Sequence, residues 1–78
     1  MYKIGVIGRR DAVLGFLTLG FSVFEEEGLS AAADRLRRMV RSGEYGVILI
    51  QNSYAEGLRE QMEAYSRLPI PAIASIPD

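Results

Sequence analysis

The sequence of 78 residues contains no cysteine, no histidine and no tryptophan. Without cysteine the chain has no disulfide, no thiol nucleophile and no thiolate ligand. Without histidine it lacks the commonest acid–base group, the serine–histidine–aspartate triad and the usual structural zinc sites. We therefore expect no catalytic residues, no cofactor and no metal site.

The sequence also lacks an excess of charge of one sign, because it has nine basic and ten acidic residues and a net charge of -1. This balance gives no electrostatic reason to bind nucleic acid or an anionic membrane. No apolar run approaches the about 20 residues that cross a bilayer. The chain opens with strand-like residues rather than with the basic and apolar segments of a signal peptide. We expect a cytoplasmic domain without membrane insertion.

What is present is an alternation of strand-like and helix-like segments over one small domain, residues 1–78, which is typical of β-α-β units and a parallel sheet. The predicted strands and helices are, in order, Tyr2–Gly8, Ala12–Leu19, Phe21–Glu25, Ala31–Ser42, Gly46–Gln51, Tyr54–Arg67 and Ile70–Ile76. Ser30 is the predicted N-cap of the second helix and Gly43 follows its end. Ser53 and Glu56 have the spacing of a capping box for the third helix.

The strand order follows from the side chains. The strands Tyr2–Gly8 and Gly46–Gln51 are apolar on both faces, which favours central positions. The strand Phe21–Glu25 turns acidic, and the last strand contains Pro71, which favours the edges. The predicted order is 2-1-3-4, a flavodoxin-like (Rossmann-like) three-layer α/β fold. Right-handed crossovers place the first helix on one face and the other two helices on the opposite face.

This arrangement leaves apolar sheet surface uncovered beside the first helix, over the third and fourth strands. The helix itself is apolar over an arc of about 220°, twice the roughly 100° stripe that a surface helix needs. We therefore predict a partner interface on this segment, at Asp11, Leu14, Gly15, Thr18 and Leu19. Without a partner, the fragment should associate with itself or expose an apolar patch.

Individual residues here also have plainer interpretations. Asp11 near the helix start is expected to cap the helix or interact with its dipole. Gly15 is either tolerated in the helix or allows a neighbouring backbone to approach closely. The acidic run 25–27 is either a solvated edge or a docking site for a basic partner.

A second candidate site is the crevice at the carboxyl ends of the first and third strands. Its lining residues would be Gly8, Arg9, Arg10, Asp11, Gln51, Asn52 and Ser53. This alternative predicts a domain that binds a small ligand or phosphate. The glycines do not have G-x-G-x-x-G spacing and no GK[ST] follows, so Gly8 is more simply explained by an unusual backbone conformation at the turn.

Several segments resemble the F subunit of V-type/A-type rotary ATPases over essentially the whole chain. They are the run Lys3–Gly8, then Asp11, Val13–Phe16, Leu19 and Gly20, followed by Gly46–Ile50, Pro69–Pro71 and Ile76–Pro77. Arg9 and Ala12 depart from the family pattern, which usually has an acidic or small residue and a hydroxyl residue at these positions.

The resemblance implies a non-catalytic subunit of the central stalk, bound to the coiled-coil D subunit inside the ring of A and B subunits. Such a subunit couples ATP hydrolysis or synthesis to proton or sodium ion transport, at the periphery of the membrane. Family members continue into a flexible segment and a C-terminal helix that reaches the catalytic subunits. We expect this chain to be the globular N-terminal domain without that helix.

Overall fold

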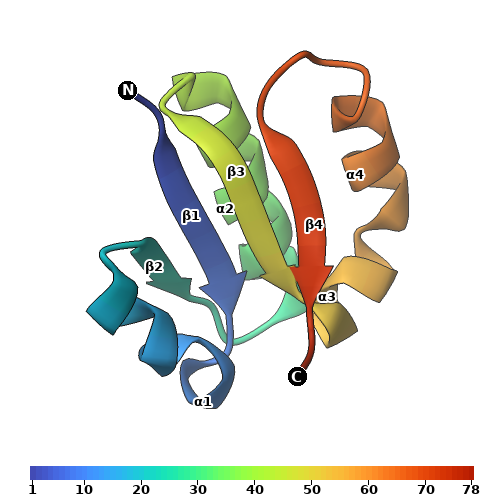
Figure 1. Cartoon of the computed structure of the whole chain (residues 1–78). Coiled ribbons are helices and arrows are strands. Elements are labelled where there is room, and N and C mark those ends of the chain that lie inside the picture. Colours follow the sequence, from blue (N-terminus) through green and yellow to red (C-terminus); the bar gives the residue numbers. More distant parts are fainter.

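A computed structural model of residues 1–78 contains one four-stranded parallel sheet with strand order β2-β1-β3-β4 (Figure 1). The strands are β1 (Lys3–Gly8), β2 (Ser22–Glu25), β3 (Tyr45–Gln51) and β4 (Ala72–Ile76). The helices are α1 (Arg10–Val13), the 3-10 helix η1 (Leu14–Leu19), α2 (Leu29–Ser42), α3 (Asn52–Gly57) and α4 (Arg59–Tyr65). The predicted α/β fold and strand order are confirmed.

The two central strands supply the most deeply buried side chains. Val6 and Ile7 of β1 and Ile48 and Ile50 of β3 are all fully buried. The edge strands carry no fully buried residue, and every position of β4 is exposed or half-buried. Strands that are apolar on both faces thus lie in the middle of the sheet, as the sequence predicts.

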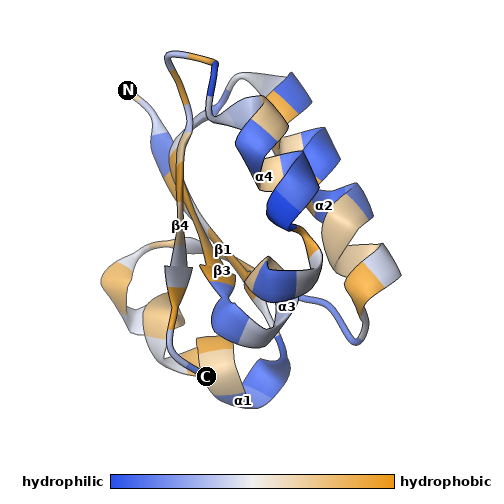
Figure 2. Ribbon diagram, turned by 90° about the vertical axis from the view of Figure 1, so that its right-hand side faces the viewer, coloured by the Kyte–Doolittle hydropathy of each residue, from blue (hydrophilic) through white to orange (hydrophobic).

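One face of the sheet is covered by α2, α3 and α4, which lie together on one side in Figure 2. Leu36 and Met39 of α2 pack with Ile7, Tyr54 and Leu58 in the main core cluster. Met62 and Tyr65 of α4 pack against this cluster. The apolar stripe predicted for the third helix therefore faces the core.

The first helix differs from the prediction. α1 has only four residues, and the chain continues as a 3-10 helix that ends at Gly20 with φ 78°. The Thr18 hydroxyl donates a hydrogen bond to the Gly15 carbonyl at 3.0 Å, which competes with regular helical bonding. Side chains at i and i+3 eclipse in a 3-10 helix, so the arc calculated for an α-helix does not apply.

Two predicted helix starts are also wrong. α2 begins at Leu29, so Ser30 lies inside the helix and Gly28 occupies the N-cap position without a side-chain bond. The third helix begins directly after β3 and divides at Leu58, with no capping box involving Ser53. The tight connection from β3 leaves no residues for a separate cap. Gly43 does end α2 in the left-handed conformation, at φ 70°, as predicted.

Candidate functional site

The sheet face opposite α2 is largely uncovered. Strand register aligns Ile4 with Val47 and Ala72, and places Leu49 beside Ala74. Residues paired in neighbouring parallel strands point to the same face, and successive residues alternate. Since Ile48 and Ile50 pack in the helical core, the intervening residues face the other side. We define the open face by its six exposed or half-buried residues, Ile4, Val47, Leu49, Ala72, Ala74 and Ile76.

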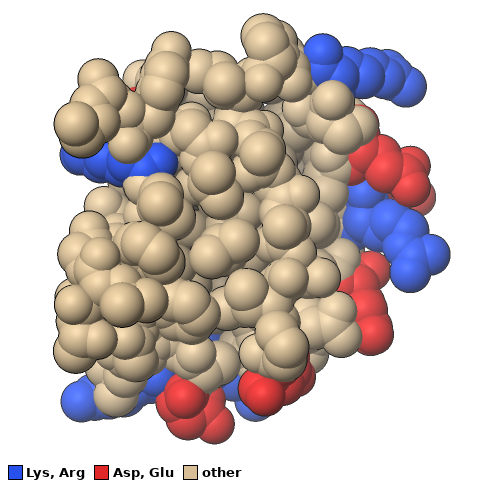
Figure 3. Space-filling model, in the orientation of Figure 1, with Lys and Arg blue, Asp and Glu red and all other residues tan.

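The open face carries no charged residue. All six side chains that define it are aliphatic. Figure 3 views the molecule from this side and shows a broad uncharged surface, with Lys, Arg, Asp and Glu gathered at its margins. Contiguous apolar surface of this kind marks interaction sites on small proteins.

The segment formed by α1 and η1 borders this face on the side of β1 and β2 (Figures 1 and 2). Val13 anchors it, with no solvent exposure. The leucines behave differently, because Leu14, Leu17 and Leu19 are 40%, 54% and 63% exposed. The segment therefore covers the β1–β2 side of the sheet and also presents apolar side chains to solvent.

The five predicted interface residues all lie exposed on this segment. Asp11 lies in the first turn of α1 and makes no capping hydrogen bond, so the expected cap is wrong. A Cβ at Gly15 would meet nothing within 4 Å, so the side of this glycine where a side chain would stand is open. The prediction missed Leu17, because an α-helical wheel gave no reason to single it out.

The crevice at the ends of β1 and β3 is closed by its own side chains. Gln51 is 5% exposed, and its Oε1 accepts a hydrogen bond from the Arg9 backbone N–H at 2.7 Å. The Ser53 backbone N–H donates to Asp78 Oδ1 at 3.0 Å. Two N–H groups that a phosphate would need are therefore used within the chain, and both adjoining helices have fewer than eight residues.

Gly8 is required for space and not for an unusual conformation. Only Gly20 and Gly43 have positive φ. A Cβ at Gly8 would lie 2.7 Å from Val13 Cγ1 and 2.9 Å from Gln51 Oε1. The structure thus brings Gly8, Arg9 and Gln51 together as packing partners, while Arg10 and Asn52 remain exposed beside them.

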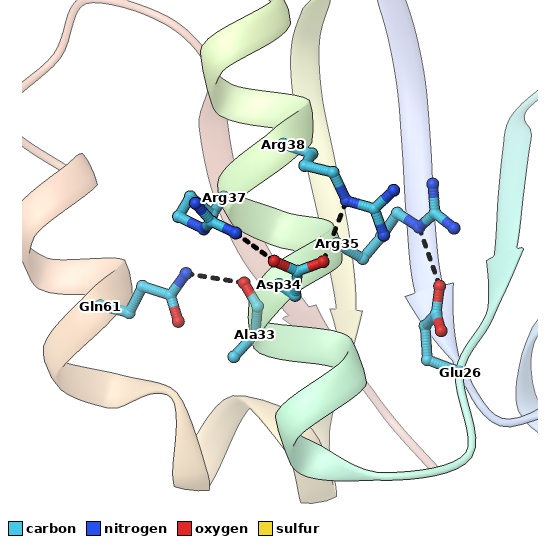
Figure 4. A network of polar contacts seen from close by, with 7 residues as sticks. All are labelled: Glu26, Ala33, Asp34, Arg35, Arg37, Arg38 and Gln61. Carbon is cyan, nitrogen blue, oxygen red and sulfur yellow. Dashed lines mark hydrogen bonds and ion pairs between the residues drawn. The ribbon is translucent and has the colours of Figure 1, made fainter.

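The acidic run after β2 is partly used inside the molecule. Glu26 Oε2 accepts a hydrogen bond from Arg35 Nε at 2.8 Å, and the Glu26 side chain is only 15% exposed (Figure 4). The Arg35 guanidinium also lies 4.5 Å from the centre of the Phe24 ring. Glu26 is therefore not free to dock a basic partner, and only Glu25 and Glu27 are exposed.

The remaining arginines of α2 lie on its wet face. Asp34 accepts hydrogen bonds or ion pairs from Arg37 and Arg38 (Figure 4). The hydrogen bond from Arg37, with the positive charge of Arg38, lowers the pKa of Asp34 below its usual value. Gln61 of α4 donates to the Ala33 carbonyl at 2.9 Å and ties the two helices together. The charged side chains on this face of α2 are thus largely paired with one another.

A metal site and a membrane-spanning helix are two other features that could indicate function. No group of three or more acidic side chains converges in a way that could hold a metal ion. None of the helices combines the length and the apolar character needed to cross a bilayer. The open face and the exposed leucines beside it are apolar surface that no other part of the chain covers.

Comparison with known proteins gives consistent matches. The family described as ATP synthase (F/14-kDa) subunit matches residues 4–78. The F subunit of the V-type ATP synthase of Clostridium perfringens is 37% identical over 78 residues, which cover 99% of this chain and 73% of that protein. The F subunit of the V-type proton ATPase of Rattus norvegicus is 34% identical over 86 residues, covering 95% of this chain and 71% of that protein.

A solved structure shares the fold. The crystal structure of the F subunit of the V-type ATP synthase of Archaeoglobus fulgidus matches with a TM-score of 0.76 and 19% sequence identity. The match covers 96% of both chains.

Proposed function

Because the chain belongs to the family of ATP synthase (F/14-kDa) subunits, we propose that it is a non-catalytic subunit of the central stalk of a V-type or A-type ATPase. It binds the coiled-coil D subunit and rotates with it within the ring of A and B subunits. In this way it couples ATP hydrolysis or synthesis to proton or sodium ion transport. The proposal places the subunit in the cytoplasm at the periphery of the membrane.

The observation that carries the proposal is the row of exposed leucines beside an uncharged sheet face. Leu14, Leu17 and Leu19 are each at least 40% exposed. Full burial of a leucine side chain contributes roughly 1.5–3 kcal/mol. A helix of about 10 Å diameter laid across the open face would supply the helical layer that this side of the sheet lacks. A coiled coil is a partner of this shape.

The proposed contacts divide between two regions. The D subunit contacts the open face and the exposed residues Asp11, Leu14, Gly15, Thr18 and Leu19. Gly15 suits such a contact, because nothing in the chain lies within 4 Å of the position of its missing Cβ. Contacts with the A and B subunits are assigned mainly to the C-terminal helix of the family.

Co-expression with the D subunit of the same assembly tests the proposal. The unaltered chain should co-purify with the D subunit in a stable complex. Leu14→Asp and Leu19→Asp should abolish the complex, because each places a charge among apolar contacts without emptying the core. Leu68→Asp is the matched control, because Leu68 is 45% exposed and follows α4, outside both the α1–η1 segment and the six residues of the open face.

Either of two results would contradict the proposed interface. One is a complex that survives both substitutions in η1. The other is a complex that is lost equally with Leu68→Asp. Circular dichroism of each variant alone shows whether the domain remains folded.

The crevice at the ends of β1 and β3 is less favoured as a ligand site. Its buried Gln51 and the side chain of Asp78 already accept the nearby N–H groups. Calorimetric titration of the chain with a nucleotide should therefore give no binding heat. Micromolar binding would favour the alternative of a small-ligand or phosphate-binding domain.

A further inference from the structure

The two edges of the sheet differ in how they are protected from other chains. β2 has four residues and ends in Glu25, and short or charged edge strands resist pairing with other strands. β4 has five uncharged residues, Ala72–Ile76, with Pro71 before them and Pro77 after them. None of the five is a proline, so each has a backbone N–H to donate. β4 is therefore an edge of the kind that accepts another strand.

Alternate residues of β4 present backbone groups that have no partner in the chain. β4 pairs with β3 on one side only, and its other side is the edge of the sheet. Outside the sheet, no hydrogen bond of the chain reaches the backbone of Ala72–Ile76. An extended backbone beside β4 would satisfy these groups, which is how peptides add to exposed sheet edges.

A groove of about 360 Å³ lies at this edge, between β4 and the helices α3 and α4. Its apolar lining consists of Ala55, Met62 and Ile73. Met62 and Ile73 are half-buried and pack against the core cluster. Ser75 also lines the groove, on the helical side of β4. Since side chains alternate between the two faces of a strand, every second side chain of an added strand would enter this groove.

The helical layer extends beyond the last strand. α4 lies outside β4 in Figure 1, and Figure 2 shows it on the same side of the sheet as α2. The flavodoxin-like strand order 2-1-3-4-5 has a fifth strand beside the fourth. This chain has four strands and none at that position. One further strand at the usual spacing of about 4.8 Å would lie beneath α4.

A second copy of β4 does not fit this position. Two edge strands related by a two-fold axis pair in the antiparallel direction, with both helical layers on the same side of the sheet. Each α4 is about 10 Å across and lies beyond its own β4, whereas the paired strands would be only about 4.8 Å apart. The two helices would therefore occupy the same space. A single extended segment avoids this overlap.

Charged side chains at the groove favour a basic residue in the partner. Glu56, Arg59 and Glu63 line the groove and are exposed, and none of them takes part in an ion pair of the chain. Two carboxylates and one guanidinium leave a net negative charge. Charge complementarity of this kind helps to select a partner.

We propose that β4 accepts an extended segment of another protein as a fifth strand beside it. The segment carries apolar side chains at alternate positions, which fill the groove, and a lysine or arginine that meets Glu56 or Glu63. The groove lies on the helical side of the sheet, opposite the open face. The inference is therefore independent of the proposed binding to the D subunit.

Hydrogen exchange followed by NMR tests the inference with the synthetic peptide acetyl-Lys-Val-Thr-Val-Thr-Val-Lys-amide. Saturation with this peptide should protect alternate amides along Ala72–Ile76, because the amides between them already bond to β3. Two further peptides carry methyl groups on the backbone nitrogens of the valines or of the threonines. One should lose binding and the other should keep it, since only alternate N–H groups of an added strand face β4.

Variants of the chain test the groove itself. Ser75→Arg should weaken binding of the peptide at least about tenfold, because its long side chain keeps the valines out of the groove. Ala64→Arg is the matched control, because Ala64 is exposed on α4 and does not line the groove, and its affinity should equal that of the unaltered chain. Glu63→Gln should weaken binding by up to about fivefold at low salt, and by less at high salt.

Three results would overturn the inference. One is the absence of protection in β4 at millimolar peptide. Another is equal binding of the two methylated peptides, or unchanged binding by Ser75→Arg. The third is protection of the same amides that rises with the concentration of the chain alone, which would indicate pairing between copies. Peptide binding by a chain that never binds the D subunit would contradict the proposed function alone.

Discussion

Replacing Gly8 with alanine tests how the end of β1 is packed. The added Cβ would lie 2.7 Å from Val13 Cγ1, 2.9 Å from Gln51 Oε1 and 3.0 Å from Gln51 Cβ. Val13 is fully buried and Gln51 is 5% exposed, so neither side chain can turn into solvent. The methyl group must therefore displace α1 from the sheet or push the Gln51 amide away from the Arg9 N–H.

The size of the effect follows from these two contacts. Forcing a methyl group into a packed core costs about 1–3 kcal/mol. Losing the hydrogen bond from the Arg9 N–H to Gln51 Oε1 costs about 0.5–1.5 kcal/mol more. Alanine also restricts the unfolded chain more than glycine does, which offsets about 0.4–1 kcal/mol of this destabilisation. We therefore expect the free energy of unfolding to fall by about 2 kcal/mol. This is a large share of the total, because a domain of 78 residues has a stability of roughly 0.05–0.15 kcal/mol per residue.

Urea unfolding followed by circular dichroism measures this loss as a change in the free energy of unfolding. Gly15→Ala is the matched control, because its Cβ would meet nothing within 4 Å and its φ is not positive. This variant should be neutral or stabilised by up to about 1 kcal/mol. If Gly8→Ala is as stable as the unaltered chain, or if both alanines destabilise equally, close packing is not why glycine occupies position 8.

Two further predictions concern charged side chains. The first is a double-mutant cycle with Glu26→Gln and Arg35→Met, measured by urea unfolding. The coupling energy between the two side chains should be about 1 kcal/mol, because the Glu26 side chain is only 15% exposed. A coupling energy near zero at low salt would refute this. The depressed pKa of Asp34 means that its contribution to stability is present above the usual value of 3.8 and is lost as pH falls through the lower folded pKa. Asp34→Asn should therefore reduce the fall in stability on the acid side, and an acid limb identical to that of the unaltered chain would contradict the pairing with Arg37.

Much of the architecture was predictable because it depends on local patterns. Strands that are apolar on both faces had to be central, and the acidic end of β2 indicated an edge. Pro71 also indicated an edge, although it lies just before β4 and not within it as predicted. The amphipathic pattern of α2 and the glycine after it located that helix to within two residues at its start. The same patterns predicted uncovered apolar surface beside the first helical segment. The use of that surface by the D subunit or by a second copy stays a prediction.

Other features depend on contacts between distant parts of the chain. The Arg9 N–H and Gln51 are 42 residues apart, so no local pattern could show that they close the crevice. The change from α1 to a 3-10 helix depends on how Val13 is held against the sheet and on the hydroxyl bond of Thr18. Helical periodicity alone therefore missed Leu17 as an exposed residue.

The clearest division between local pattern and long-range packing lies within β3. Val47 and Leu49 alternate with Ile48 and Ile50, so either face of this strand would be apolar if it stayed uncovered. The residue pattern could not say which pair that would be, since both pairs are equally hydrophobic. The position of α2 decides which pair is buried, because this helix packs on the side of Ile48 and Ile50, and both are completely buried. Val47 and Leu49 thereby became part of the open face.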